Sequence, residues 1–90
     1  MAIVYQETRL DEAHLKVALV ERSRADLLVR RVHSAGQAQG DALWFITRVP
    51  GNATVTVSFT SLGMAQVKVC FVDGIGEEGW QVPRPRHIQL

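Results

Sequence analysis

The sequence predicts an all-β domain built from about seven short strand-turn units. The first observation is a repeat: the stretch AHLKVALVE, from Ala13 to Glu21, returns in similar form as AQVKVCFVD, from Ala65 to Asp73. The second is the alternation of apolar and polar residues within these units, which is typical of half-buried strands. The third is the regular recurrence of turn residues between the units. Together the three patterns favour short strands wound round a common axis.

The units follow one another along nearly the whole chain of 90 residues. In order they are a truncated start AIVYQET at Ala2, AHLKVALVE at Ala13, ADLLVRRVH at Ala25, a looser AQGDALWFIT at Ala38, ATVTVSFTS at Ala53, AQVKVCFVD at Ala65, and a truncated end GEEGW that finishes at Trp80. The alanines that open the five longer units are spaced 12 to 15 residues apart. Four of nine residues are identical between the copies at 13–21 and 65–73, so duplication explains the pattern better than chance.

One segment, residues 11–35, also fits a helix. Asp11 is a suitable N-cap, the segment is rich in helix-forming residues, and Leu28 and Val32 would share one helical face. The equivalent unit ATVTVSFT at Ala53 alternates strictly between Thr or Ser and apolar residues, which is typical of a strand. If the units are structurally equivalent, all of them are strands.

Strand geometry sorts the side chains, because successive residues point to opposite faces. The predicted inward residues are Ala13, Leu15, Val17, Leu19, Ala25, Leu27, Val29, Ala53, Val55, Val57, Phe59, Ala65, Val67, Val69 and Phe71. The opposite face is mixed and mostly polar, so we expect it to meet water at least in part. We expect the alanine that opens each inward row to mark a crowded place near the axis. Pro50 and Gly51, between two units, fit the central positions of a type II turn.

The pattern A-x-Φ-x-V-x-Φ-V, together with GDALW at residues 40–44 and GW at 79–80, resembles a bacterial domain-of-unknown-function family whose members form a septoil (7-1 torus) knot. The resemblance covers residues 2–81 and implies a deeply knotted domain in which two passes of the chain interlace. Arg31 and Thr60 depart from the usual pattern. Without the resemblance, the sequence favours a small closed barrel or a β-solenoid. Residues 82–90, rich in Pro and Arg, are predicted to be a flexible tail.

Composition excludes several classes of partner. With 47% apolar residues, 21% charged residues and a net charge of +1, the chain lacks the field that attracts nucleic acid or an acidic membrane surface. No apolar segment is long enough to span a membrane, and no secretory signal is recognisable, so we expect a cytoplasmic protein. The single cysteine, Cys70, agrees with a reducing compartment. We favour a monomer, with a homodimer through the edges of ATVTVSFTS as the alternative.

The sequence contains no catalytic or metal-binding pattern. His14, His33 and His87 lack the spacing of metal ligands, and Cys70 aligns with the outward positions of other units. The glycine-rich stretch at residues 74–78 lacks the lysine and the helix of a phosphate-binding loop. We therefore expect no cofactor, no metal ion and no enzymatic activity, and we assign no catalytic residue.

One constellation is of interest for binding. Five polar residues occupy the same position at the ends of successive units, namely Glu21, His33, Thr47, Ser61 and Asp73. If the units circle an axis, these side chains form a ring at one end of the domain, where a small ligand or an ion could bind. The competing interpretation is that polar residues end strands because turns need them.

Two functions are compatible with these observations. The favoured one is a non-enzymatic, kinetically stable domain that acts as a scaffold or interaction module, because no paired carboxylates, triad or metal spacing is present. The alternative is a small-ligand or ion binder that uses the ring of strand-end residues.

Trp44 and Trp80 are expected in the core or as caps. The tail, with Arg84 and Arg86, is expected to be solvated, with docking to an acidic partner as the alternative.

Overall fold

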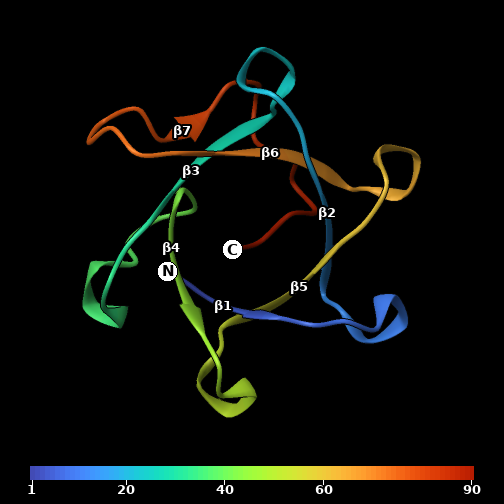
Figure 1. Ribbon diagram of the computed structural model, residues 1–90, viewed down its shortest axis with the longest axis vertical. Coiled ribbons are helices and arrows are strands. Elements are labelled where there is room, and N and C mark those ends of the chain that lie inside the picture. Colours follow the sequence, from blue (N-terminus) through green and yellow to red (C-terminus); the bar gives the residue numbers. More distant parts are fainter.

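Six parallel strands close into a barrel, and a short seventh strand runs antiparallel beside the third (Figure 1). The structure is a computed structural model that describes residues 1–90. The strands are β1 (Ala2–Gln6), β2 (Leu15–Leu19), β3 (Leu27–Arg31), β4 (Leu43–Thr47), β5 (Val55–Phe59), β6 (Val67–Val72) and β7 (Gly79–Trp80). The predicted all-β fold of about seven strands is confirmed, and residues 11–35 contain no α-helix. None of the helices present has the length and apolar character needed to cross a membrane.

The strand order shows that two passes of the chain are interleaved. Around the barrel the order is β4-β1-β5-β2-β6-β3, and β3 pairs with β4 to close the circle. The first pass lays down β1 to β4, and the second inserts β5 between β1 and β2 and β6 between β2 and β3 (Figure 1). Val17 accordingly pairs with Phe59 on one side and with Val67 on the other. The predicted winding of strand units round a common axis is therefore confirmed, in the form of a closed barrel.

Each link between successive strands from β1 to β6 contains a three-residue 3-10 helix. These are η1 (Leu10–Glu12), η2 (Arg22–Arg24), η3 (Ala35–Gln37), η4 (Pro50–Asn52) and η5 (Leu62–Met64). They project outward from the barrel, away from its axis (Figure 1). The prediction of a type II turn at Pro50 and Gly51 is wrong, because Gly51 does not have a positive φ. Both residues lie in η4, where the fixed φ of proline suits the first helical position.

The alanine that opens each longer unit has a different role from the one predicted. Each is the C-cap residue of a 3-10 helix; the backbone N–H of Ala25, for example, donates to the carbonyl of Arg22 at 3.3 Å. After Ala13, Ala25, Ala53 and Ala65 the first inward side chain of the strand comes two residues later, and none of the five alanines belongs to the central core. Ala25 instead packs with Leu28 and Val72 in a second cluster, apart from the central core. The outer face of the barrel is thus partly buried and not uniformly wet.

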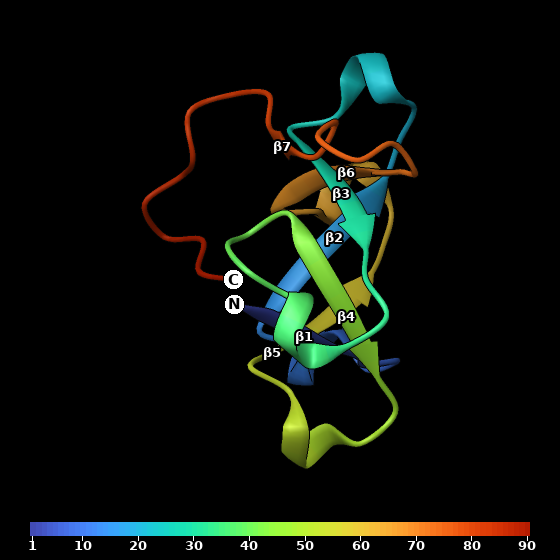
Figure 2. The same cartoon turned by 90° about the vertical axis from the view of Figure 1, so that its left-hand side faces the viewer.

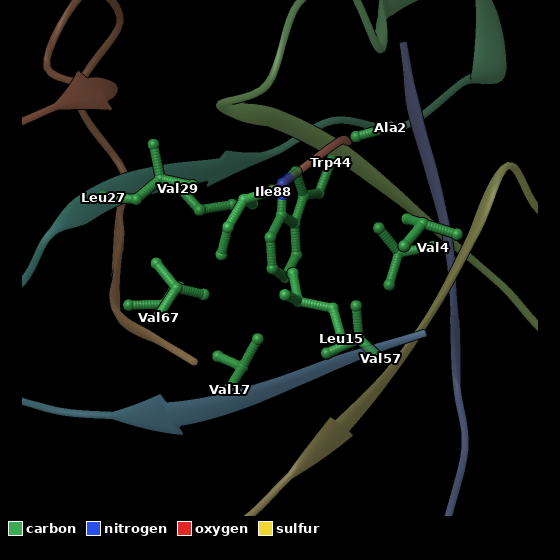
Figure 3. Packing of buried hydrophobic residues seen from close by; sticks show 12 residues of the cluster. Ala2, Val4, Leu15, Val17, Leu27, Val29, Trp44, Val57, Val67 and Ile88 are labelled. Carbon is green, nitrogen blue, oxygen red and sulfur yellow. The ribbon is translucent and has the colours of Figure 1, made fainter. Parts of the chain in front are cut away.

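The core consists of two inward side chains from each of β1, β2, β3, β5 and β6, one from β4 and one residue from the tail. Its buried members are Ala2, Val4, Leu15, Val17, Leu27, Val29, Trp44, Val55, Val57, Val67, Val69 and Ile88. Figure 3 shows these side chains converging on the indole of Trp44, the largest fully buried side chain. Because β4 contributes an indole where other strands contribute valine or leucine, the barrel interior is filled without a central channel.

The third inward position of a strand reaches the rim of the barrel and leaves the core. Leu19, predicted to point inward with Leu15 and Val17, is 55% exposed. Phe59 and Phe71 hold the same position on β5 and β6 and are only partly buried. Five-residue strands are about 17 Å long, so two layers of side chains fill the barrel and a third emerges at its end. The assignment of Leu19 to the core is therefore wrong.

The C-terminal segment differs from an extended tail. It leaves the barrel after β7, makes a wide loop and returns to the end of the barrel where the N-terminus also lies (Figure 2). Ile88 is 1% exposed and belongs to the core, and Leu90 packs against the same cluster. One end of the barrel is thus covered by residues 82–90, because an aliphatic side chain there shields the indole of Trp44 from water.

Candidate functional site

Four of the five predicted ring residues lie just beyond the carboxyl ends of β2, β3, β5 and β6, and Thr47 is the last residue of β4; these ends meet at one end of the barrel. The structure divides them among different surroundings. His33 and Asp73 line one groove, whereas Glu21 lines a separate hollow together with Arg22. Ser61 is exposed and lies in neither. The ring is therefore not assembled as a single site, and only one pair of its members comes together.

Three of the five ring residues have identifiable roles in turns. Thr47 is buried and its Oγ1 accepts a hydrogen bond from the backbone N–H of Val49 at 3.2 Å. Glu21 and Ser61 are the N-cap residues of η2 and η5, and their carbonyl oxygens accept the first hydrogen bond of each 3-10 turn. These contacts favour the interpretation that polar residues end the strands because the turns require them.

The groove that holds His33 and Asp73 has a volume of about 750 Å³. It lies where the ends of β3, β4 and β6 meet, and half of its ten lining residues are hydrophobic, among them Phe45, Ile46 and Ile75. This volume falls within the range of about 300–1,000 Å³ that is typical of small-molecule sites. His33 and Asp73 are not part of a larger cluster, since no group of three or more His, Cys, Asp or Glu side chains that could hold a metal ion occurs in the structure.

Charge in the groove is distributed unevenly between two neighbouring arginines. Arg30 Nε donates a hydrogen bond of 3.0 Å to Glu78 Oε1, and this contact holds the pKa of Glu78 below its ordinary value of 4.5. Arg31 forms no ion pair, and its guanidinium carbon lies 5.0 Å from the centre of the Phe71 ring. Arg31 is therefore a cation that is held in place by an aromatic ring and is not neutralised by a carboxylate.

Beside this groove the open end of the barrel presents a set of mostly apolar side chains, which we call the carboxyl rim. Its members are Leu19, Arg31, Phe59 and Phe71, the third inward residues of their strands, and Ile46, the second inward residue of β4. Phe71 makes edge-to-face contacts with Trp44 at 6.0 Å and with Phe59 at 6.4 Å between ring centres. Ile46 is 38% exposed. The rim is an exposed apolar surface continuous with the core.

Sequence reasoning missed the carboxyl rim because the same alternation that marks a core position also marks a rim position. Leu19, Phe59 and Phe71 were all predicted to be inward, which describes their direction but not their depth. A usable signal is their place as the third inward residue, two positions before the polar strand-end residue. Ile46 was not singled out, since the unit that contains it is irregular.

Other residues considered for chemistry have structural surroundings. His14 and Thr56 form a reciprocal pair, in which the backbone N–H of His14 donates to Thr56 Oγ1 at 3.0 Å and the backbone N–H of Thr56 donates to His14 Nδ1 at 3.4 Å. Cys70 is half-buried and its Sγ donates to the carbonyl of Phe71 at 3.5 Å. His87 is exposed in the tail.

At the opposite end of the barrel, Asp41 joins three segments of the chain. Its Oδ2 accepts a hydrogen bond from Trp80 Nε1 at 3.0 Å and forms an ion pair with Arg84 Nε at 3.1 Å. Its carbonyl oxygen accepts a hydrogen bond from Trp44 Nε1 at 2.7 Å. Both tryptophans thus occupy core or capping positions, as predicted. The role of Asp41 was not predicted, although it stands directly in the GDALW motif.

The closed barrel of interleaved parallel strands defines a class of small β-proteins built from repeated strand-turn units. Within that class, the family model of the 7(1) septoil knot domain matches residues 1–81. The chain belongs to the septoil knot domain family, which confirms the resemblance drawn from the sequence. Neither a curated protein nor a solved structure matches the chain. The family match ends just before residues 82–90, the segment that covers the barrel.

Proposed function

We propose that the protein is a non-enzymatic, kinetically stable β-domain that acts as an interaction module and binds a partner protein through its carboxyl rim. The observation that carries this proposal is the asymmetry of the barrel. Residues 82–90 cover one end, whereas Leu19 and Ile46 are exposed at the other, beside the partly buried Phe59 and Phe71. A contiguous apolar surface of this kind marks interaction sites in soluble proteins.

The composition of the rim favours a partner with an apolar side chain and a nearby carboxylate. Aromatic residues and arginine are the residue types most enriched in protein interfaces. Arg31 supplies a cation without an acidic partner in this chain, and Phe71 fixes its guanidinium in place. The interleaved passes support the rim as a rigid platform, because each rim residue projects from a strand that is paired on both sides.

Affinity capture with rim variants tests the proposal. We expect the immobilised wild-type protein to retain a specific partner from a lysate and the Leu19→Asp variant to lose it, because a carboxylate there disrupts the apolar surface. Leu62→Asp is the matched control, since Leu62 is an equally large exposed residue on η5 and lines a separate hollow that contains no rim residue. Identical capture by all three proteins, each shown to be folded by its melting curve, would contradict the proposal.

A second candidate function, small-ligand binding, is favoured by the groove that brings His33 and Asp73 together beside Arg31. A thermal-shift screen with metal ions and metabolites tests it, because a ligand at 100 times its Kd adds about 2.7 kcal/mol to the free energy of unfolding. We expect a true ligand to lose its effect on the His33→Ala variant. Its effect on Glu21→Gln should persist, because Glu21 lies in a different hollow. A flat screen counts against this function.

We further propose that the protein acts as a monomer in the bacterial cytoplasm. The lone half-buried Cys70 supports a reducing compartment such as the cytoplasm.

The closed strand order supports the monomer, since no barrel strand leaves an open edge for a second copy to pair with. A homodimer formed through strand edges is the alternative, and light scattering of the purified chain across a range of concentrations distinguishes the two.

A further inference from the structure

The covered end of the barrel has the properties of a peptide-binding site. Ile88 inserts beside the indole of Trp44 and is 1% exposed, and Leu90 packs on the same cluster (Figure 3). No main-chain hydrogen bond joins residues 82–90 to a barrel strand. The segment is therefore held by side chains that enter a preformed surface, as a bound peptide is, and not as a further strand of the sheet.

Polar contacts give this docking a specific chemistry. Arg84 Nε forms an ion pair with Asp41 Oδ2 at 3.1 Å, and the same guanidinium donates two hydrogen bonds to the carbonyl of Ile88, at 3.2 and 3.0 Å. The Asp41 carboxylate is only 18% exposed, so screening by water is reduced there. The bound segment is thus recognised by an arginine four residues before an aliphatic anchor.

The connection between the barrel and the anchor is loose. Val82, Pro83 and Arg86 are exposed and form no hydrogen bond or ion pair, so between Gln81 and Ile88 the segment is tied to the barrel by the ion pair of Arg84. Figure 2 shows the segment swinging clear of the barrel before it returns. From residue 81 to Ile88 the extended chain reaches about 25 Å, enough to cross to a second barrel placed end to end with the first. Exposed hinge segments of this kind favour the exchange of identical elements between copies.

We propose that the amino end of the barrel is a peptide-binding site that accepts residues 82–90 of a second copy as well as those of its own chain. This site lies at the end opposite the carboxyl rim and does not depend on the proposed function. Within one chain the effective concentration of the tail is in the millimolar range, so the isolated protein keeps its own tail at ordinary concentrations. Exchange becomes dominant when the internal contact is weakened and the contact between copies is not.

Charge reversal at Asp41 and Arg84 creates that situation. In Asp41→Arg the tail arginine faces an introduced arginine, and in Arg84→Asp the introduced aspartate faces Asp41, so each variant repels its own tail. When the two variants are mixed in equal amounts, reciprocal exchange pairs opposite charges at both barrels. We expect each variant alone to be monomeric and the mixture to form a one-to-one heterodimer, measured by native mass spectrometry and light scattering.

Two controls separate exchange from general charge attraction. The double variant Asp41→Arg with Arg84→Asp restores opposite charges within one chain, and we expect it to be monomeric. A mixture of Asp41→Arg with Arg86→Asp should form no heterodimer, because Arg86 is exposed and makes no ion pair. A mixture of the two reversed variants that stays monomeric up to about millimolar concentration overturns the proposal. Equal dimerisation with Arg86→Asp overturns it as well.

A second measurement covers the case in which a charge-reversed chain fails to fold. The full-length Ile88→Ser variant removes the aliphatic anchor and uncovers the site. We expect a fluorescent peptide of residues 82–90 to bind this variant at least tenfold more tightly than it binds the wild-type chain, as measured by anisotropy. The same peptide carrying Ile88→Ser should not bind. Equal affinity of the intact peptide for both proteins overturns the proposal.

Discussion

Leu15 in β2 is paired in register with Val57 in β5, although one strand belongs to the first pass of the chain and the other to the second. Both side chains are buried in the same cluster. Each core layer is therefore completed only when the second pass has been inserted between strands of the first. Neither pass has a core of its own, and we expect the domain to unfold as one unit.

Replacing Val57 with lysine should prevent folding. Val57 is fully buried, and an ammonium group there would be removed from water without a partner, at a cost comparable with the total stability of about 5–15 kcal/mol of a small domain. Far-ultraviolet circular dichroism and urea titration measure the effect. Leu62→Lys is the control, because Leu62 is exposed on η5 and should tolerate the charge. A cooperatively folded Val57→Lys protein would show that the side chain at position 57 faces water.

Truncation of Leu15 and of Leu19 should have very different effects, although the two side chains point to the same face of β2. Leu15→Ala leaves a cavity in the core and should lower the free energy of unfolding by about 2–5 kcal/mol. Leu19→Ala removes an exposed rim residue and should change it by at most about 0.5 kcal/mol. Urea unfolding of both variants measures these changes. Similar losses in the free energy of unfolding would show that Leu19 lies in the core.

Acid should selectively weaken the contribution of Glu78. Its pKa is lowered in the folded protein because Arg30 donates a hydrogen bond to its carboxylate. A carboxyl group with a lowered folded-state pKa stabilises the protein above its unfolded-state pKa, and this stabilisation is lost as the pH falls through the folded-state value. At pH 7 we expect the wild type to melt above Glu78→Gln, and the difference should shrink below about pH 4.5.

Glu21→Gln is the matched control for this pH series, because Glu21 is exposed and forms no ion pair. Its melting temperature should differ from that of the wild type by the same small amount at every pH. A Glu78→Gln difference that stays constant, or grows, between pH 7 and pH 3 would mean that the Arg30 contact does not stabilise the folded state.

The strands could be predicted from the sequence because alternation in one copy resolved the ambiguity of another. ATVTVSFTS at Ala53 reads only as a strand, and its likeness to the stretch from Ala13 to Glu21 carried the assignment across the chain. How deeply each inward side chain is buried in the barrel could not be predicted in the same way. Alternation gives the direction of Leu19 but not the point at which a strand leaves the barrel, since that depends on how many layers of side chains fill the interior.

The docking of the tail and the arrangement of the binding surfaces could not be predicted from the sequence for a related reason. Ile88 is a single aliphatic residue in a segment of prolines and arginines, so no periodicity marks it as a core residue. The strand-end residues were predicted to share one end of the barrel, and they do. They are nevertheless spread round its circumference, and His33 meets Asp73 only because β6 of the second pass lies beside β3 of the first.

Refolding kinetics test the central claim, that the second pass is inserted between strands of the first, most directly. Small all-β domains with mainly non-local pairings refold in about milliseconds to seconds. We expect this chain, diluted from denaturant and followed by tryptophan fluorescence, to refold in minutes or longer, because inserting β5 and β6 between strands of the first pass requires the chain to be threaded. Added prolyl isomerase should not accelerate the slow phase. Complete recovery within milliseconds would contradict the account.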